Sequence, residues 1–430
     1  MNPQSLEQIA SCVAGYDPNA LPVAQAQEFI ARLVPRVSAV ESLALRSALG
    51  RVLARDVVSA IDVPAHDNSA MDGYALRGAD LAAQGDSVMP VAGTALAGAA
   101  GQAFAVAPGH CVRIMTGAVM PAGLDTVVPQ EFTQPEGDRA VRIPAGVVRT
   151  GDNRRLAGED LTRGSAALRA GRLLRPADLG LLASLGQAEV PVLRKLRVAF
   201  FSTGDELRSI GEPLDEGCVY DSNRYTIWGM LQRLGCEVID LGVVRDDPAA
   251  LRAAFAEAAA SADAVITSGG VSVGEADHTK KIMAELGDVL FWRIAMRPGR
   301  PMAIGRIESN GHQAILFGLP GNPVAVMVTF YAFVRDALRA MSGQADGLPS
   351  PWLRAVSTAA LRKKPGRTEY QRGIVTRAAD GRWQVAITGS QGSGILSSMS
   401  VANGMVVLHH GQGNVAAGDE VDVIPFDGLV

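Results

Sequence analysis

Short apolar segments alternate with longer segments of helical spacing between residues 196 and 341, and this alternation limits the fold more than any other feature. Strands are expected at residues 198–201, 238–241, 264–266, 290–294 and 314–317, and helices at residues 224–234, at 248–260 and after Asn322. The pattern predicts an open, doubly wound, mostly parallel sheet with helices on its faces. Ligands of such folds bind beyond the carboxyl ends of the strands, so the segments that follow the strands are the first candidates for a site.

The flanking stretches predict further domains, so the expected fold class is α/β plus β in a multidomain chain. Helical spacing recurs at residues 23–33 and 40–49, and again at 176–185, a helix that we expect to pack back on the first segment. The expected domains are a discontinuous helical and linking domain (1–57 and 161–195), an inserted β-rich domain (58–160), the α/β domain (196–344) and a small C-terminal β barrel or sandwich (345–430).

Composition excludes several classes of protein. A hydrophobic share of 48% allows large cores, and a net charge of −4 gives no general attraction to nucleic acid or to an anionic membrane. No apolar run is long enough to span a bilayer and no signal peptide is visible, so a cytoplasmic location is expected. The four cysteines lack C-x-x-C or zinc spacing, which favours reduced thiols, with a pair between Cys218 and Cys236 as the alternative.

The turn after the third strand is the most informative motif. Small residues at a strand-to-helix junction, here Ser268-Gly269-Gly270, allow backbone N–H groups to hold a phosphate or another oxyanion. Glu275 and Asp277 follow at once, and their carboxylates would repel a phosphate unless a divalent cation lies between them. The motif therefore predicts an anionic ligand together with a metal ion.

The other strands also end in polar, glycine-bearing segments, with acids and arginines among them. The binding candidates from all of these segments are Ser202, Thr203, Gly204, Asp221, Ser222, Asn223, Ser268, Gly269, Gly270, Ser272, Gly274, Arg297, Pro298, Arg300, Pro301, Gly321 and Asn322. Taken singly, such residues are more often helix caps, turns or a solvated surface pair. Their convergence at the carboxyl ends of one sheet favours a polyanion and metal site.

Two groups lie outside this region. Residues 67–75 are dense in polar groups, with Thr116 and Asp160 further on, and their alternative interpretation is a turn-rich β domain with Asx caps. Near the C-terminus, Arg367, Arg372 and Ser393 are candidates for contact with an anion, although basic residues are also common on β edges. The phosphate-loop, H-E-x-x-H, G-x-S-x-G and G-x-G-x-x-G motifs are absent.

Eight blocks in order carry a family resemblance. They are DNSAMDGYA (67–75), MTGA (115–118), GED (158–160), STGDEL (202–207), YDSN (220–223), SGGVSVGEAD (268–277), GLPGNPV (318–324) and QGSG (391–394). With these blocks the chain resembles, over nearly its whole length, the molybdopterin molybdenumtransferase (MoeA) family, to which the C-terminal part of gephyrin also belongs.

The resemblance implies insertion of molybdenum from molybdate into adenylylated molybdopterin, with Mg²⁺ as the divalent cation and AMP as a product. It implies roles in activity for Asp67 or Asp72, Thr116, Asp160, Glu206, Asp246 and Asp277, with Glu206, Asp246 and Asp277 holding the metal. Arg293, Arg297 and Arg300 stand where the family commonly has lysines for molybdate or phosphate, and Arg372 and Ser393 match positions that line the cleft. Arginine keeps the charge but binds oxyanions through a planar fork.

The resemblance also implies a homodimer in which the α/β domain of one chain and the N-terminal domains of the other form one cleft. The protein that adenylylates molybdopterin and downstream maturation proteins are the implied partners. A non-catalytic molybdopterin-binding or scaffold protein of the same fold is the alternative function, and a nucleotide-dependent doubly wound enzyme is disfavoured because the dinucleotide motif is absent. The sequence leaves open the choice between molybdate and tungstate, the key acid among Asp67 and Asp72, and the apoenzymes that receive the product.

Overall fold

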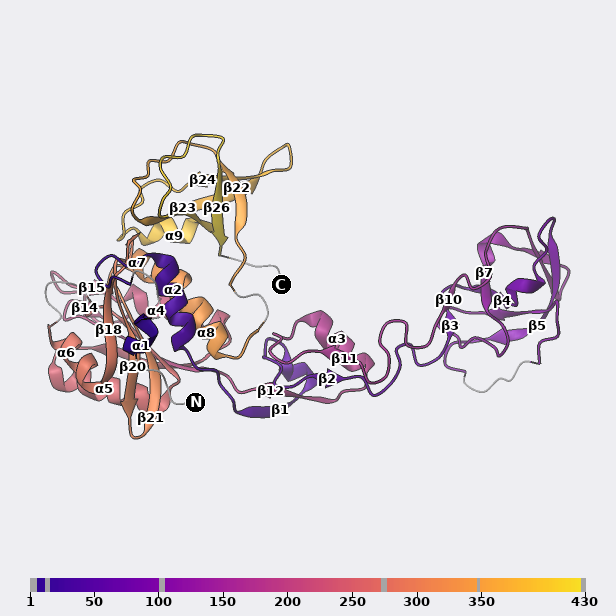
Figure 1. Cartoon of the computed structure of the whole chain (residues 1–430), viewed down its shortest axis with the longest axis horizontal. Coiled ribbons are helices and arrows are strands. Elements are labelled where there is room, and N and C mark those ends of the chain that lie inside the picture. Colours follow the sequence, from indigo (N-terminus) through magenta and orange to yellow (C-terminus); the bar gives the residue numbers. More distant parts are fainter. Residues whose placement is uncertain (1–5, 12–15, 100–104, 272–276, 346–348, 427–430) are drawn as a thin grey trace.

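The structure is a computed structural model that describes residues 6–11, 16–99, 105–271, 277–345 and 349–426. The molecule is elongated (Figure 1). An α/β part and the C-terminal β part form its large end, a narrow central part follows, and a β-rich part, which we call the distal part, forms the other end. Within one chain, the large end and the distal part are therefore far apart.

The α/β part is built on a six-stranded sheet in the order β16-β13-β17-β21-β20-β18. The neighbours among the first four strands are parallel, and β20 and β18 join antiparallel. The bounds are β13 (Arg197–Thr203), β16 (Glu237–Val244), β17 (Ala264–Ser268), β18 (Gly287–Arg293), β20 (Pro301–Ser309) and β21 (His312–Leu319). The mostly parallel sheet is confirmed, and all five expected strands are present.

Strand β20 was not expected. It forms a hairpin with β21 through Asn310 and Gly311, which have φ of 53° and 74°. A two-residue turn in which both residues have positive φ matches the right-handed twist of paired strands best, and Asn-Gly is the preferred sequence of that turn. The Asn-Gly pair is therefore the sequence signal for this strand.

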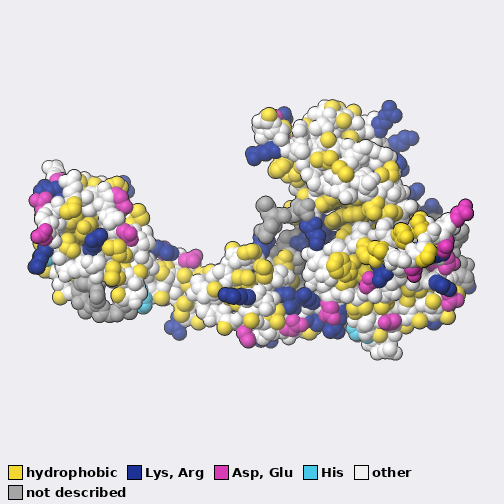
Figure 2. Space-filling view, turned by 180° about the vertical axis from the view of Figure 1, so that it is seen from behind, with side chains coloured by type: hydrophobic (Ala, Val, Ile, Leu, Met, Phe, Trp, Pro, Cys, Tyr) yellow, Lys and Arg dark blue, Asp and Glu magenta, His cyan; other side chains and the backbone are white. Residues whose placement is uncertain are grey.

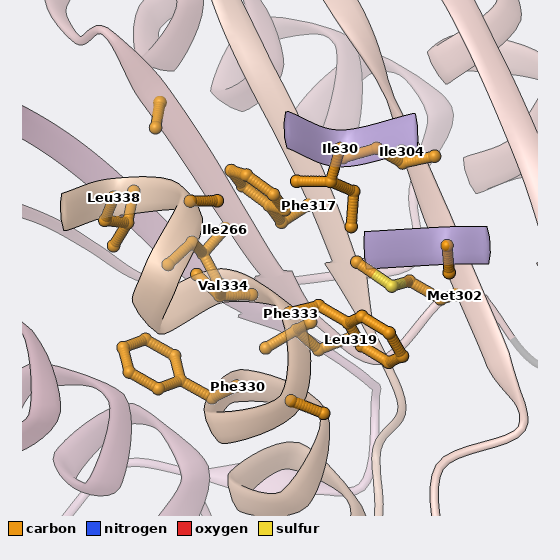
Figure 3. Close-up of a cluster of buried hydrophobic side chains, with 14 of the residues drawn as sticks. Ile30, Ile266, Met302, Ile304, Phe317, Leu319, Phe330, Phe333, Val334 and Leu338 are labelled. Carbon is orange, nitrogen blue, oxygen red and sulfur yellow. The ribbon is translucent and has the colours of Figure 1, made fainter. Parts of the chain in front are cut away.

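Helices cover both faces of the sheet. They are α4 (Ser222–Arg233), α5 (Pro248–Ser261), α6 (Asp277–Leu286), α7 (Pro323–Thr329), the π-helical segment η4 (Phe330–Val334) and α8 (Arg335–Met341). Side chains of β13 alternate between the faces: Phe201 packs with Phe255 of α5 on one face, and Phe200 lies in the core of the other. Figure 3 shows that second core, where Ile266 and Phe317 of the sheet meet Phe330 and Leu338.

The N-terminal helices α1 (Leu6–Ser11) and α2 (Val23–Leu33) belong to this second core. Phe29 and Ile30 of α2 are buried in it together with Trp292 of β18. Helix α2 has the bounds that its spacing predicts, but it packs on the α/β part rather than on α3 (Pro176–Ser184). The domain boundaries given above remain a prediction.

The central part disagrees with one expectation. Residues 40–49 were predicted to form a helix, but β1 (Val40–Ala44) pairs antiparallel with β12 (Glu189–Leu193), and only η1 (Leu45–Ala48) is helical, as a 3₁₀ turn. Pairing with a strand almost 150 residues away overrides the local spacing. Helix α3 packs on η1 as expected, and β2 (Val57–Val58) pairs with β11 (Ala166–Leu168).

The distal part contains a six-stranded sheet in the order β7-β4-β6-β5-β9-β8. Its elements are β4 (Gly73–Leu76), η2 (Gly78–Asp80), β5 (Ser87–Ala95), β6 (Cys111–Ile114), β7 (Thr126–Pro129), η3 (Gln130–Phe132), β8 (Gln134–Glu136) and β9 (Ala140–Ile143). Beside it, β3 (Asn68–Ser69) pairs with β10 (Arg154–Arg155). The expected β-rich insertion is therefore present, with small apolar cores of its own.

The C-terminal part is a small barrel. Its strands are β22 (Leu353–Ser357), β23 (Thr368–Arg377), β24 (Trp383–Ile387), β25 (Gly404–Leu408) and β26 (Glu420–Pro425), with the helix α9 (Leu396–Val401). The β23–β25 pairing closes the sheet, and β23 and β24 form the expected hairpin. The short strand β19 (Met296–Arg297) of the α/β part pairs with the start of β23 and so joins the two parts.

Two further observations concern the whole described chain. The longest of its helices, α5, has 14 residues, and none of the described helices combines the length and the hydropathy needed to cross a membrane. Cys111, Cys218 and Cys236 are free thiols, so the alternative pair between Cys218 and Cys236 is wrong.

Candidate functional site

The carboxyl ends of the parallel strands border a cleft of about 550 Å³, which we call the glycine cleft. It brings together Thr203, Gly204, Glu206, Asp221, Ser222, Asn223, Asp246, Ser268, Gly269, Gly270, Gly321 and Asn322, all of which the sequence analysis names. Ser202 lies beneath it, fully buried at the end of β13. Ser272 and Gly274 lie outside the described residues.

The glycine turn after β17 requires glycine. Gly269 has a φ of 96°, and a Cβ on it would lie 2.6 Å from the carbonyl oxygen of Thr203. Only a residue without a side chain fits a backbone that close. The turn therefore leaves main-chain groups at the cleft, as the interpretation of an oxyanion cradle requires.

Asn223 ties the glycine cleft together. Its Nδ2 donates to Ser268 Oγ (2.8 Å) and to the carbonyl oxygen of Gly321 (2.7 Å), so helix α4 holds the turns after β17 and β21. Asp221 is the N-cap of α4, and its Oδ1 accepts a hydrogen bond from the backbone N–H of Arg224 (3.1 Å). Because these contacts join three segments, the shape of the cleft is fixed before any ligand binds.

Some buried oxygens at the glycine cleft have no hydrogen-bond partner within the described residues. They are Thr203 Oγ1, Asp221 Oδ2 and Asn223 Oδ1. A buried polar group without a partner costs about 1–3 kcal/mol, so such groups gather where a ligand, an ion or water completes them. This part of the chain is therefore built to receive another group.

Two carboxylates face the same cleft. Glu206 follows Gly204 so closely that a Cβ on that glycine would lie 2.5 Å from Glu206 Oε2, and the backbone N–H of Asp246 donates to Asp205 Oδ1 (3.3 Å). No group of three His, Cys, Asp or Glu side chains within the described ranges is close enough to hold a metal ion. The side chain of Asp277, the third predicted ligand, is not described. Mg²⁺ is commonly held by one or two carboxylates plus phosphate oxygens, and Glu206 and Asp246 fit that need.

A second cleft, of about 450 Å³, lies beside the first, and we call it the arginine cleft. Its lining includes Arg297, Pro298, Arg300 and Pro301 from the α/β part, and Arg367, Gln391 and Ser393 from the C-terminal barrel. Arg297 and Arg300 are exposed, and no ion pair is seen for either within the described residues, whereas Arg367 pairs with Glu369 (2.8 Å). Gly321 and Asn322 border both clefts, so one loop separates the carboxylates from the arginines.

Two predicted binding residues have other places. Arg293, at the end of β18, is exposed and is not among the residues that line either cleft. Arg372 is fully buried, and its guanidinium donates to the carbonyl oxygens of Ser390, Gln391 and Gly392 (2.9–3.2 Å) and to Ser398 Oγ (3.0 Å). Burial lowers the pKa of this guanidinium. Arg372 thus holds the loop that presents Gln391 and Ser393 instead of lining the cleft.

The distal part positions its acids differently. Asp72 Oδ1 accepts hydrogen bonds from both the backbone N–H and the hydroxyl of Thr116 (2.7 Å each), and the backbone bond is the main cause that lowers the pKa of Asp72. Asp67 Oδ1 accepts from Ala157 N (2.8 Å), and Oδ2 pairs with Arg154. The bond from Ala157 likewise lowers the pKa of Asp67. Both oxygens of Asp67 are therefore used within the distal part.

The four predicted residues of the distal part do not reach the glycine cleft of their own chain. Asp160 is exposed after β10, whereas β14, which begins at the residue after Glu206, lies at the opposite end of the molecule from β3 and β10 (Figure 1). Asp72 and Thr116 contact each other, and neither they nor Asp160 line either of the two clefts.

Some cleft residues were not singled out from the sequence. Leu207, Val219, Tyr220 and Thr279 line the glycine cleft, and Gln391 lines the arginine cleft. Tyr220 directly precedes Asp221, and Gln391 is two residues from Ser393, so adjacency to a named residue was the available signal. Leu207 likewise directly follows Glu206. The contribution of Val219 has no such signal, because it depends on the pairing of β14 (Leu207–Arg208) with β15 (Val219–Tyr220).

A larger groove elsewhere is less suited to chemistry. It has a volume of about 800 Å³ and is lined mainly by apolar side chains of α2, α8 and the barrel, such as Ile30 and Trp352. Hydrophobic side chains gather on the surface where the barrel lies on the α/β part (Figure 2). Active sites combine apolar walls with convergent polar groups, and that combination occurs at the sheet edge.

Comparisons with known proteins match most of the chain. Family models match residues 21–186 (MoeA N-terminal region, domain I and II), 199–340 (probable molybdopterin binding domain) and 354–426 (MoeA C-terminal region, domain IV). The chain is 42% identical over 406 residues to the molybdopterin molybdenumtransferase of Haemophilus influenzae, covering 94% of this chain and 98% of that one. It is 38% identical to molybdopterin molybdenumtransferase 2 of Mycobacterium tuberculosis, covering 88% and 93%.

Solved structures give the same result. The crystal structure of the molybdopterin biosynthesis moeA protein from Pyrococcus horikoshii OT3 has a TM-score of 0.80 and 28% identity, and the match covers 95% of this chain and all of that one. The chain has a role in molybdenum cofactor biosynthesis, and it is an enzyme of the transferase class. It belongs to the MoeA family of molybdopterin molybdenumtransferases.

Proposed function

We propose that the chain inserts molybdenum from molybdate into adenylylated molybdopterin, in an Mg²⁺-dependent reaction that yields the molybdenum cofactor and AMP. The observation that carries the proposal is the pair of clefts with opposite character on either side of one loop. The reaction needs one place for a phosphoanhydride with its cation and a neighbouring place for a tetrahedral oxyanion. In this proposal the glycine cleft takes the first and the arginine cleft, which shares Gly321 and Asn322 with it, takes the second.

In this proposal the glycine cleft binds the adenylylated end of the substrate. The main-chain groups of Ser268, Gly269 and Gly270 hold a phosphate, and Asn223 keeps this turn and the Gly321 turn in register. Glu206 and Asp246, with Asp277 as the predicted third ligand, would hold Mg²⁺. The ion, when bound, neutralises charge on the phosphoanhydride and so favours AMP as a leaving group.

The arginine cleft binds molybdate. Arg297 and Arg300 offer planar forks to its oxygens, and Ser393 adds a hydroxyl. The two thiolates of the pterin then displace molybdate oxygens, which leave as water with protons from the thiols and the solvent, while water attacks the anhydride at the other cleft and AMP leaves. Arg297 and Arg300 keep the positive charge of the lysines that the family commonly has at these positions. They bind an oxyanion through a planar fork instead of a point charge, so the geometry of binding differs.

A homodimer completes the proposed site. The distal part presents Asp72, whose Oδ1 is held by Thr116, and Met71 and Val119 are exposed apolar side chains of the same part. Beside the glycine cleft, Tyr225 and Trp228 of α4 are exposed as well. We propose that the distal part of a second copy covers this surface and brings Asp72 to the glycine cleft. Asp72 rather than Asp67 is the acting acid, because both oxygens of Asp67 serve Ala157 and Arg154.

The remaining context follows from the substrate. We place the reaction in the cytoplasm, downstream of the protein that adenylylates molybdopterin and upstream of the proteins that mature molybdoenzymes. Nucleic acid and membrane are not partners in this proposal.

AMP release tests the proposal. Purified protein with adenylylated molybdopterin, molybdate and Mg²⁺ should release AMP, and EDTA or the substitution Asp277→Ala should abolish release while circular dichroism stays unchanged. Binding of the substrate without any release of AMP would favour the alternative, a non-catalytic molybdopterin-binding or scaffold protein.

A further inference from the structure

We infer that the ring of Tyr220 is a stacking platform for a flat heteroaromatic ring of the ligand, adenine or pterin. The inference rests on the proposed function, whose substrate carries both ring systems. It concerns a wall of the glycine cleft to which the proposed chemistry assigns no task.

The paired strands β14 and β15 form this wall, whereas polar residues and glycines make up most of the rest of the lining. Leu207, Val219 and Tyr220 line it, and Tyr220 remains 47% exposed although it borders a concave surface. A phosphate, a metal ion or an oxyanion gains nothing from such a surface. A planar ring gains stacking and apolar contact from it, at about 1–3 kcal/mol for a nucleic-acid base on an aromatic side chain, which corresponds to roughly five- to 150-fold in affinity.

The ring of Tyr220 is held at both ends. Its hydroxyl donates to the carbonyl oxygen of Glu212 (3.1 Å). Its backbone lies in β15, where Val219 N donates to the carbonyl oxygen of Glu206 (2.9 Å) and Asp221 N donates to that of Arg208 (3.0 Å). Little side-chain freedom is left to lose when a ligand binds, so the platform is preorganised.

The position of Tyr220 in the chain fits the same role. The carbonyl oxygen of Glu206, a proposed metal ligand, accepts a hydrogen bond from Val219, the residue before Tyr220. Asp221, the residue after Tyr220, caps α4 beside the glycine turns. A ligand whose phosphate lies at the glycine turns therefore has Tyr220 as the aromatic surface within the same cleft. The platform explains why an exposed tyrosine is anchored here by its hydroxyl.

The test uses the riboside monophosphate of 2-aminopurine, a fluorescent isomer of adenine. The emission of this AMP analogue falls when its ring stacks. With the parent chain, emission should fall on binding. Tyr220→Leu should weaken binding roughly five- to 150-fold and abolish the quenching, while Tyr220→Phe keeps both because the ring remains. Trp383→Leu is the control, since Trp383 is a similarly exposed aromatic side chain on β24 of the barrel and lines neither cleft.

Inorganic phosphate distinguishes a platform from a structural role. Its affinity, measured by calorimetry, should be the same in the parent and in Tyr220→Leu, and an equal loss for phosphate and for the analogue would overturn the inference. Hydroxymethylpterin is the second probe: a loss for the purine alone assigns the platform to adenine, and a loss for the pterin alone assigns it to the pterin. Unchanged affinity for both overturns the inference.

Turnover separates this inference from the proposed function. If the parent releases AMP and Tyr220→Leu does so with an unchanged KM for adenylylated molybdopterin, the platform is refuted and the transferase reaction stands. If the parent releases no AMP, yet the ring probes lose affinity in Tyr220→Leu, the platform stands and the reaction is refuted.

Discussion

The candidate site residues at the two ends of the molecule differ in how their polar atoms are satisfied. At the glycine cleft of the large end, Thr203, Asp221 and Asn223 each keep a buried oxygen without a partner in the described chain. In the distal part, Asp67 and Asp72 accept hydrogen bonds from their own neighbours. The difference teaches that the large end is incomplete until a ligand arrives, whereas the distal part presents a carboxylate that is already set.

The largest predicted effect tests whether these two ends act together. Glu206→Gln at the cleft should lower AMP release about a thousandfold, because the variant loses a proposed metal ligand. Asp72→Asn in the distal part should lower it strongly as well. In a homodimer with shared clefts, mixed dimers of the two inactive variants contain one cleft in which neither change is present.

Random mixing of the two variants should therefore restore about a quarter of the parent activity, since half of the dimers are mixed and each has one intact cleft. The measurement is AMP release after co-expression with two different tags. No restoration, in a preparation in which mixed dimers are isolated by both tags, would contradict a cleft shared between the two ends. Each variant alone is the control.

The next largest predicted effect is a loss of stability on substitution of Arg372, which holds the loop that contributes Gln391 and Ser393 to the arginine cleft. Arg372→Met removes the donor that serves the carbonyl oxygens of Ser390, Gln391 and Gly392. We expect a loss of about 3 kcal/mol in the free energy of unfolding, measured with denaturant, because several buried acceptors lose their partner. Arg377→Met, an exposed position of the same strand, should change stability little. A loss as small as that of the control would show that Arg372 does not hold the loop.

A smaller effect compares two arginines that the family resemblance treats alike. Arg297 lines the arginine cleft and Arg293 does not. Arg297→Ala should raise the KM for molybdate about tenfold, since a hydrogen bond to a charged group contributes about 1.5–3 kcal/mol, and Arg297→Lys should recover part of the loss. Arg293→Ala should leave that KM unchanged, and an equal rise for both alanine variants would contradict the assignment by position.

The fold could be predicted further from the sequence than the roles of single residues. Apolar runs and caps identify α2, α5 and the strands of the α/β sheet, because burial on both faces leaves a strong local signal. The strand β1 was missed because its stability comes from β12 at a distant place in the sequence. Burial of Arg372 is equally invisible in the sequence, since an arginine in a β segment has the same letter whether it meets a ligand or three carbonyl oxygens.

The site shows the same limit. Glycine turns after strands predict the glycine cleft and most of its lining, since parallel strands end at one edge. The sequence does not show that Glu206 and Arg297 line different clefts. The loop with Gly321 lies between these clefts because of the order of the strands in the sheet, and that order is not visible in the sequence. The proposal of Asp72 over Asp67 likewise rests on hydrogen-bond partners, which the sequence does not show.

The smallest predicted effect tests whether Asp72 is set by its neighbour. Thr116→Val removes the hydroxyl that donates to Asp72 Oδ1 but keeps the backbone N–H, so the pKa of Asp72 should rise part of the way towards its ordinary value. Because the folded-state pKa lies below the unfolded value of about 3.9, the carboxylate stabilises the parent above that pH, and this contribution is lost as the pH falls through the folded pKa. The variant should therefore lose less stability on acidification. Carboxyl NMR titration of Asp72 measures the shift directly, and an unchanged pKa would mean that the backbone bond alone sets this acid.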